Sequence, residues 1–329
     1  MRYIIGVDGG GTSTRVALAN TDGEILAIGK SGASSIDTVS REETGEHIAE
    51  GLKKCLEKYF KQYGGNIEDI ECFFVSLGGI DSKADKEYVV NIVQEYTEKI
   101  INIKNIVAEN DTRAALAGGL AEKSGVIFIV GTGAVCFGIN EELQSWKSGG
   151  WGYKIDDFGS GFYLGREALT MMVKCMDGRE EDEEFQLAIK KLIGINSLSE
   201  VSERLYKRKF NRTDIAGIAP EVLKLAEKKN RIALEILDKG AEELSLMIKS
   251  VCKKLNIKGM KYTALGGVIE GCDIYRNKLI EKIKVELDID YNSPYMAGIG
   301  GAVLLSLYEV IGDKAYETAD IIKRSLNIV

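Results

Sequence analysis

Apolar positions along this chain follow two alternating patterns, short continuous runs typical of buried strands and the three-to-four-residue spacing typical of amphipathic helices. The chain opens with the apolar run Tyr3–Val7, a polar tip and the β-rich segment Arg15–Ala19, and the sequence EILAIG then reads as a third strand. Ser40 and Glu43 form a capping-box signature ahead of the first helical spacing. The pattern predicts a hairpin, a third strand and a helix.

The same alternation continues toward the middle of the chain. It predicts a short buried strand, a helix, another strand and an alanine-rich helix, at residues 72–79, 85–100, 105–111 and 112–121. Strands that alternate with helices in this way are typical of an α/β fold.

At Gly125 the opening pattern returns. The segment GVIFIVGTGAVCFGIN is again an apolar strand, a glycine and threonine tip and a second apolar strand, and LQSWKSGG follows where the first copy has ILAIGKSG. Thr12 and Thr132 take equivalent places in the two copies. This internal similarity predicts two related α/β lobes that face each other and offer their glycine hairpins to a shared cleft. A chance recurrence of hairpin chemistry is the alternative.

The tip of the first hairpin, DGGGTST at residues 8–14, has the composition of a phosphate site. Glycines let a ligand approach the main chain, consecutive N–H groups make a concave anion site, and the hydroxyls add donors. A Rossmann fingerprint is excluded because a strand rather than a helix follows, and a P-loop is excluded because the spacing before Gly29-Lys30-Ser31 is one residue too long. A tight turn without a ligand is the alternative, although such a turn needs only one or two glycines.

Composition and charge narrow the class of protein. The 329 residues are 45% hydrophobic, and a chain of this length usually forms more than one core, so two domains are expected. The net charge of -7 comes from interleaved acids and bases, which disfavours a nucleic-acid surface. The sequence has no apolar run of about 18 residues and no basic, apolar leader, so it predicts a cytoplasmic protein with no membrane partner.

Several other features are interpreted as structural. Six scattered cysteines without a CxxC pair indicate buried free thiols, and the single histidine, His47, disfavours a metal cluster or a hydrolase triad. The acidic run REEDEEF at 179–185 is interpreted as a solvated helix start. The basic run KRKFNR at 207–212 is interpreted as a helix-end charge cluster, with a phosphate contact as the alternative.

Several segments together resemble a known superfamily. The paired glycine hairpins and TALGGVI (263–269) before a helix resemble the two phosphate segments and the adenosine segment of actin, sugar kinases and heat-shock chaperones. Within that superfamily, four segments in order along the chain resemble the N-acetylglucosamine kinases and the related Bad/Bcr-type ATPases: AENDTRAALAGG (108–119), VGTGAVC (130–136), GGWGYKIDDFGSGFYLGREAL (149–169) and DIAGIAPEVLKLAEK (214–228). GGWG followed by D-x-G-S-G is the most specific part.

The resemblance implies a fold of two ribonuclease H-like domains of the actin-like ATPase type, facing a central cleft. We place the first domain at residues 1–116 and the second at 117–329, with the last helix a candidate to pack back on the N-terminal domain. The resemblance also suggests a homodimer.

The resemblance further implies ATP-dependent phosphorylation of a hydroxyl on an amino sugar, with Mg²⁺ bridging the phosphates. Asp111 matches the family's catalytic base and follows a predicted strand; the alternative is that it only caps the helix that it opens. Asp8 matches the acidic position that holds Mg²⁺ through water, and the alternative is that it caps its own turn.

The nucleotide positions implied by the resemblance lie in the two hairpins, in an apolar helical segment and in TALGGVI. They are Gly10, Gly11, Thr12, Ser13, Thr132, Gly133, Gly217, Gly266 and Gly267. For Gly217 a close contact between helices is the alternative.

The sugar positions implied by the resemblance begin with Gly150, Trp151, Gly152 and Asp157. A carboxylate such as Asp157 can accept hydrogen bonds from two sugar hydroxyls at once. Its neighbour Asp156 is interpreted as a turn or solvent-facing acid. For Trp151 an ordinary place in the core is the alternative.

The chain departs from the family where sugar-contacting asparagines are expected. Ser35 and the pair Ala134-Val135 stand at these substrate positions. An apolar Val135 side chain cannot donate a hydrogen bond, so recognition of the acetamido group or a neighbouring hydroxyl must differ. N-acetylglucosamine, N-acetylmuramic acid, glucosamine and a plain hexose all stay open as substrates.

Two other classes of function are alternatives to a kinase. The first is an ATPase activator of a dehydratase or reductase system of the Bad/Bcr type. Such relatives hold an iron–sulfur cluster between subunits through cysteines, whereas this sequence has no pair of cysteines in a glycine-rich motif. The second is a nucleotide-dependent scaffold or filament, for which the GGWG and D-x-G-S-G segment would have no purpose.

Overall fold

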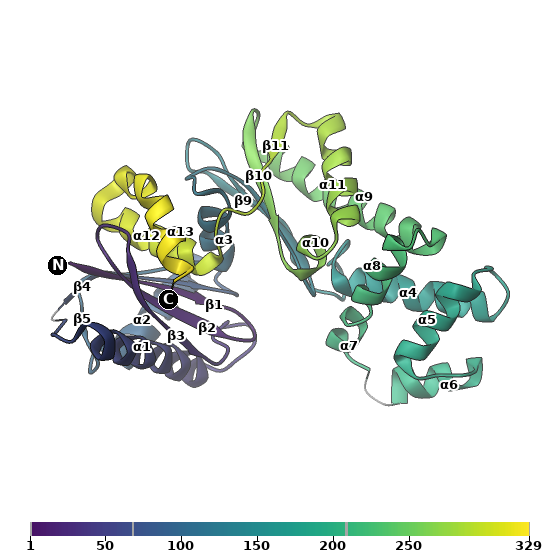
Figure 1. The fold of residues 1–329 in the computed structure, drawn as a ribbon, viewed down its shortest axis with the longest axis horizontal. Coiled ribbons are helices and arrows are strands. Elements are labelled where there is room, and N and C mark those ends of the chain that lie inside the picture. The colour runs from purple at the N-terminus through teal and green to yellow at the C-terminus, as the bar shows by residue number, and fades with distance from the viewer. Residues whose placement is uncertain (1, 68, 208–209, 329) are drawn as a thin grey trace. The chain divides into compact units, whose positions relative to one another are not determined.

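A computed structural model of the chain describes residues 2–67, 69–207 and 210–328. The chain divides into two compact units, each built around one sheet (Figure 1). The first unit comprises Met1–Lys123 and Asn292–Val329, and the second comprises Ser124–Tyr291. This division differs from a cut after residue 116, because helix α3 (Asp111–Leu120) packs against helix α12 (Gly298–Ile311) and so lies whole in the first unit.

The first sheet is mixed and brings three strand ends to one edge. Its strands are β1 (Tyr3–Gly9), β2 (Thr14–Asn20), β3 (Ile25–Ser31), β4 (Asp69–Leu77), β5 (Asn102–Ile103) and β6 (Ile106–Asn110). The first three form an antiparallel meander, and β4 pairs in parallel with both β1 and β6. Gly9, Leu77 and Asn110 are therefore register partners at the carboxyl ends of the parallel strands.

Helices cover both faces of this sheet. They are α1 (Arg41–Tyr63), α2 (Lys83–Thr97), α3, α12 and α13 (Ala319–Leu326), and Figure 1 shows the last two in yellow beside the purple N-terminal strands. Alternation along β1 separates the two layers, because Ile5 packs with α1 and α2 whereas Ile4 packs with α3 and α12. Gly6 lets α12 lie directly on β1, since a Cβ there would stand 2.5 Å from the backbone nitrogen of Val303.

Lysines of α1 protect the edge strand β3. Lys54 Nζ donates to the carbonyl of Lys30 at 3.2 Å, and Lys58 Nζ donates to that of Ile28 at 2.7 Å. The groove beside this edge has a volume of about 830 Å³, and Arg15, Lys61 and Lys323 also line it. Charged side chains over free edge carbonyls oppose pairing with another strand, so the sheet edge accounts for the basic groove.

The second sheet repeats the arrangement of the first. Its strands are β7 (Gly125–Val130), β8 (Ala134–Ile139), β9 (Ser145–Gly149), β10 (Met260–Leu265) and β11 (Ile289–Tyr291). The first three again form an antiparallel meander, β10 pairs in parallel with β7, and β11 pairs in parallel with β10. The sequence repeat that predicts two related α/β lobes is therefore confirmed by the topology.

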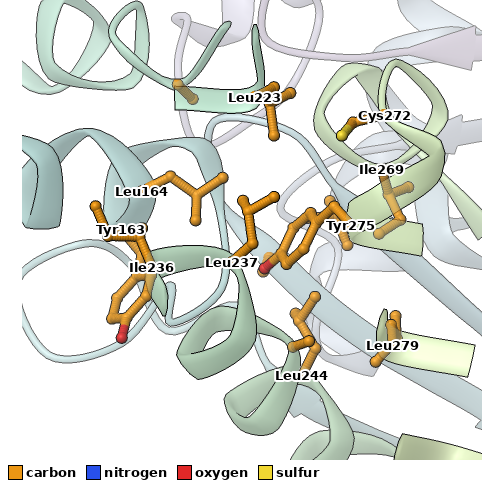
Figure 2. Close-up of a cluster of buried hydrophobic side chains, with 14 of the residues drawn as sticks. Tyr163, Leu164, Leu223, Ile236, Leu237, Leu244, Ile269, Cys272, Tyr275 and Leu279 are labelled. Carbon is orange, nitrogen blue, oxygen red and sulfur yellow. The ribbon is translucent and has the colours of Figure 1, made fainter. Parts of the chain in front are cut away.

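A large helical layer completes the second unit. Its helices are α4 (Gly161–Met176), α5 (Glu183–Ile193), α6 (Leu198–Ser202), α7 (Arg212–Ala216), α8 (Ala219–Glu227), α9 (Arg231–Leu255), α10 (Gly267–Glu270) and α11 (Asp273–Glu286), with a π-helical turn at Glu203–Lys207. Figure 2 shows Tyr275 among the apolar side chains that join these helices, including Leu237 and Leu244. Its hydroxyl donates to the carbonyl of Gly159 at 2.6 Å and thereby anchors the loop before α4.

The features interpreted as structural are found in such roles. Asp182 caps α5 and two glutamates fill its first turn, as predicted for the acidic run. His47 Nδ1 lies 2.5 Å from the carbonyl oxygen of Ala33. All six cysteines are free and five are buried, with Cys175 partly exposed. Among the described residues, no helix has the length and apolar character that a membrane span requires.

Candidate active site

The tip of the first glycine hairpin presents free backbone donors. The amide of Gly10 donates to the carbonyl of Ser13 at 3.1 Å, and in the described part of the chain the amides of Gly11, Thr12 and Ser13 have no acceptor. None of the glycines at this tip has a positive φ. Their role is to leave space: a Cβ on Gly9 would overlap Ser34 Oγ, whereas a Cβ on Gly10 would meet nothing within 4 Å. The tip therefore has room for an anion against the main chain.

A second segment fastens the back of this tip. The amides of Ser34 and Ser35 both donate to the carbonyl of Gly10, at 3.1 and 3.3 Å. Thr14 Oγ1 lies 2.6 Å from Ser34 Oγ, and both residues are fully buried. Ser34 was not among the predicted site residues, because its contact with the hairpin arises only from the fold. These bonds give the tip a fixed shape before any ligand arrives.

Asp111 lies directly after β6, at the first position of α3. The helix cap is Asn110, whose Oδ1 accepts from the amide of Thr112 at 3.0 Å, so the interpretation of Asp111 as the cap is wrong. A Cβ on Gly78 would stand 2.9 Å from Ser35 Oγ and 3.5 Å from Asp111 Oδ2. The fold therefore brings Ser35 and Asp111 to the same glycine at the end of β4.

Asp111 and Asp8, two carboxyl groups of the first unit, have raised pKa values. Burial, with a smaller contribution from the charge of Asp8, raises the pKa of Asp111 from 3.8 to about 6. Burial also raises the pKa of Asp8, and the nearby Arg15 partly offsets this. In the described residues no hydrogen bond ties the Asp8 side chain to its own turn; its carboxylate faces α12, 3.2 Å from where a Cβ of Gly298 would be. A carboxylate with a pKa near neutrality is suited to accept a proton from an alcohol.

The second hairpin has the same open tip in the second unit. The amide of Gly131 donates to Gly133 at 2.9 Å, and among the described residues the amides of Thr132 and Gly133 have no acceptor. The start of α4 supports the tip, because the amides of Gly161 and Phe162 donate to the carbonyls of Gly131 and Thr132, at 2.8 and 3.1 Å. Gly131 has open space where its Cβ would be.

Three segments that are far apart in sequence meet at Gly161. A Cβ there would contact the carbonyl of Gly131 at 3.1 Å, Val268 Cγ2 at 3.2 Å and the carbonyl of Ala216 at 3.7 Å. The second glycine tip, the TALGGVI segment and the end of α7 are thus neighbours in one unit. These are the segments to which the family resemblance assigns the nucleotide.

The predicted glycines of this neighbourhood have different conformations. Gly266 has a φ of +108°, and its backbone lies so close to Val130 that a Cβ would stand 2.5 Å from that carbonyl oxygen. Gly267 is exposed with nothing within 4 Å of its Cβ position. Gly217 lies between α7 and α8, and the atoms closest to its Cβ position belong to its own turn. The interpretation of Gly217 as a contact between helices is therefore wrong.

Asp157 is the buried carboxylate of the candidate sugar segment. Its side chain accepts from the amide of Ala134 at 3.2 Å and from Arg212 at 2.8 Å, and the residue is 2% exposed with a φ of +65°. Burial raises its pKa despite both donors. A non-glycine residue held in the left-handed region is strained, and such strain is concentrated at functional sites. Arg212 was not among the predicted site residues, although the basic run at 207–212 contained it.

The glycine-rich loop before Asp157 lies along β8. A Cβ on Gly150 would stand 3.1 Å from Val135 Cβ, and both Gly150 and Gly152 have a positive φ, +77° and +88°. Trp151 is 63% exposed, so an ordinary place in the core is wrong for it. Its amide donates to Asp156 Oδ2 at 3.1 Å, which makes Asp156 the turn acid that was expected. The second unit thus gathers Val135, Gly150 and Asp157 with the second glycine tip.

Candidate site residues lie in both units, and the family match also extends over both units. The profile of the BadF/BadG/BcrA/BcrD ATPase family matches residues 5–306. The chain belongs to this family. Because the match spans both units, the two hairpins of this BadF/BadG/BcrA/BcrD family member lie within it, and use of ATP follows from the membership.

Curated relatives and solved structures give the same result for this family member. It is 30% identical over 293 residues to an N-acetylmuramic acid/N-acetylglucosamine kinase of Clostridium acetobutylicum, a match that covers 88% of this chain and 92% of the relative. It is also 30% identical over 287 residues to an N-acetyl-D-glucosamine kinase of Dictyostelium discoideum, covering 85% and 89%. The crystal structure of a putative N-acetylglucosamine kinase from Chromobacterium violaceum aligns with a TM-score of 0.70 at 23% identity, covering 93% and 99%. That likeness shows that the fold is the same.

Proposed function

We propose that this protein transfers the γ-phosphate of ATP to a hydroxyl group of an amino sugar. The relatives at 30% identity, which match most of the chain, are kinases of N-acetylglucosamine, and one also of N-acetylmuramic acid. The observation that carries the proposal is Asp111: a half-buried carboxylate at a strand end, not used as the helix cap, with its pKa raised to about 6. Such a group is placed and tuned to act as a general base.

The chemical step follows from these roles. The sugar hydroxyl oxygen forms a bond to the γ-phosphorus while the bond from that phosphorus to the bridging oxygen breaks, and the bonding electron pair leaves with ADP. The hydroxyl proton passes to the Asp111 carboxylate. Amides of the two glycine tips bind phosphate oxygens, and Asp157 accepts hydrogen bonds from sugar hydroxyls.

Mg²⁺ belongs to the proposal as the partner of ATP. Hard oxygen ligands suit Mg²⁺, and the carboxylate of Asp8 beside the first tip is such a ligand, directly or through water. The described residues include no group of three or more histidine, cysteine or acidic side chains that could hold a metal by themselves. This fits an ion that is bound mainly by nucleotide phosphates with the help of one carboxylate. The ion would neutralise phosphate charge.

The identity of the sugar is proposed at the level of its class. Ser35 is 5% exposed and shares the neighbourhood of Asp111, so its hydroxyl can contact a sugar group near the reacting oxygen. Val135 presents a methyl surface beside Gly150 and suits an apolar part of the substrate, such as an acetyl methyl group. We therefore favour an N-acetylated amino sugar, N-acetylglucosamine or N-acetylmuramic acid, over glucosamine and a plain hexose.

The test is a comparison of ADP release with four sugars. With Mg-ATP and N-acetylglucosamine, N-acetylmuramic acid, glucosamine or glucose, we expect sugar-dependent turnover that is fastest with an N-acetylated sugar. Asp111→Asn should reduce kcat by about 10²-fold to 10⁴-fold, the range of general-base catalysis. Absence of turnover with all four sugars, or a near-normal kcat for a folded Asp111→Asn variant, would contradict the proposal.

The cysteines argue against the dehydratase-activator alternative. An iron–sulfur cluster between subunits needs thiols at the surface, and five of the six here are buried. Their free state also supports, as part of the proposal, a reducing cytoplasmic location. The homodimer suggested by the family resemblance stays a prediction, to be checked by light scattering.

A further inference from the structure

Arg212, the first residue of α7, lies at the tip of the second glycine hairpin. Its terminal nitrogen NH2 is 2.8 Å from Asp157 Oδ2, and a Cβ on Gly133 would stand 2.7 Å from the same nitrogen. The ring of Tyr153 lies beside the guanidinium, with 5.5 Å between the ring centroid and Cζ. Only a glycine at position 133 lets the guanidinium approach the tip this closely.

Not every N–H donor of this guanidinium has an acceptor within the described part of the protein. Arg212 Nε is buried and has no hydrogen-bond partner among the described residues, although 38% of the side chain is exposed. A guanidinium carries five N–H donors in a fixed fork and stays charged. A buried donor without an acceptor costs free energy, so a site that retains one is expected to have a ligand that satisfies it.

The backbone beside this side chain points to the class of ligand. The amides of Thr132 and Gly133, at the same tip, have no acceptor in the described part of the chain. Two free amides and a guanidinium with an unused N–H lie together at this tip, beside the Asp157 carboxylate that pairs with the guanidinium. Phosphate oxygens are the acceptors that suit both kinds of donor. The structure therefore offers one phosphate group a backbone cradle and a cationic fork.

We propose that Arg212 binds the terminal phosphate of the nucleotide, and that Asp157 orients the guanidinium for this contact. This inference rests on the proposed kinase function and adds a residue to it. Arginine matches phosphate geometry better than lysine does, and a fixed cation near the transferred phosphoryl group stabilises the charge of its transition state. All the groups involved lie in the second unit.

Asp157 can hold the arginine and still bind a sugar. Each oxygen of an ionised carboxylate has about two acceptor positions. Oδ1 uses one for the amide of Ala134 and Oδ2 uses one for Arg212, which leaves one position on each oxygen for a sugar hydroxyl. The Asp157–Arg212 pair would then connect the sugar to the phosphate that it receives.

The experiment separates phosphate binding from mere support of Asp157. Affinities for Mg-ADP and for the non-hydrolysable analogue Mg-AMP-PNP are measured by calorimetry without sugar, for the wild type, Arg212→Gln and Arg212→Lys. Lys207→Gln is the matched control, because it removes an exposed charge from the same basic run. Steady-state kinetics with the preferred sugar and circular dichroism accompany each variant.

The proposal predicts a loss that depends on the γ-phosphate. Arg212→Gln should lower the affinity for AMP-PNP by about 10-fold or more relative to the affinity for ADP, and lower kcat by about 10²-fold. Arg212→Lys should fold normally and lose less of both the AMP-PNP affinity and kcat. Lys207→Gln should match the wild type. If both Arg212 variants keep the wild-type ratio of the two affinities and only raise KM for the sugar, Arg212 merely supports Asp157 and the proposal is wrong. A wild type that binds no Mg-ATP would instead overturn the proposed function itself.

Discussion

Replacement of the proposed base, Asp111→Asn, should stabilise the folded protein above neutral pH while it removes activity. The pKa of Asp111 is raised from 3.8 to about 6, chiefly by burial. Each pKa unit corresponds to 1.36 kcal/mol, so keeping this carboxylate charged in the fold costs about 3 kcal/mol. Asparagine has nearly the same shape and no charge to desolvate. Its gain in the free energy of unfolding should therefore approach that value.

The sign of the pH dependence makes this prediction specific. Well below pH 4 the carboxyl group is protonated in both the folded and the unfolded chain, and the variant gains nothing. Between about pH 4 and pH 6 the unfolded chain ionises first, so the wild type becomes progressively less stable than the variant. Above about pH 6 the full difference is present. The prediction applies to the protein without nucleotide or Mg²⁺, because a bound cation would lower the cost.

Calorimetric melting at pH 4 and pH 8 is the assay. At pH 8 the variant should melt roughly 6 to 12 °C above the wild type, since 1 kcal/mol corresponds to about 2–4 °C for units of this size. At pH 4 the two midpoints should differ by only about 1–2 °C, because the unfolded carboxyl group has just begun to ionise. The matched control is Asp22→Asn, which removes an exposed aspartate and should change neither midpoint. Equal or lower stability of Asp111→Asn at pH 8 would refute the argument from burial.

Three further predictions concern the glycine tips, the loop before α4 and the thiols. Gly9→Ala should lower the free energy of unfolding in urea by roughly 1–3 kcal/mol, because its Cβ overlaps Ser34 Oγ. Gly10→Ala should keep the wild-type stability and weaken the binding of Mg-ATP in calorimetry. Equal stability of the two variants would contradict this prediction. Tyr275→Phe removes a buried hydrogen bond to Gly159 and should cost about 1–2 kcal/mol and raise KM for the sugar, so an unchanged KM would argue against coupling to Asp157. With Ellman's reagent, Cys175 should react before the five buried thiols in the native protein, although partial burial raises its own pKa. A buried thiol that reacts as fast as Cys175 would contradict the described burial.

Periodicity and capping chemistry predict most elements, and their errors have local causes. Ser40 and Glu43 form the capping box of α1 as expected. The second helix was expected to begin at Asp85, but Ser82 caps it and Asp85 is the third residue of the box. Likewise Asn110, rather than Asp111, caps α3. When two residues near a helix start can both cap it, only the backbone conformation decides between them.

Contacts between distant segments are the part that the sequence does not reveal. Ser34 reaches the first tip across 20 residues, and Arg212 reaches Asp157 across 55. The basic run at 207–212 gave a signal, but a charge cluster at a helix end explains such a run equally well. The buried partner Asp157 and the unsatisfied Nε distinguish the two interpretations, and both depend on tertiary structure.

The glycines of the two tips are needed because they lack a Cβ, not because they have unusual backbone angles. The space that they leave lets polar side chains from remote segments approach the tips. In each hairpin one glycine, Gly10 or Gly131, has empty space at its Cβ position, while another, Gly9 or Gly133, is in contact with a polar side chain from a remote segment. The open glycine gives a ligand access to the backbone amides. The crowded glycine admits Ser34 in one unit and Arg212 in the other. Alanine at the two kinds of position should therefore cause different losses, ligand affinity at the first and the placement of the supporting side chain at the second.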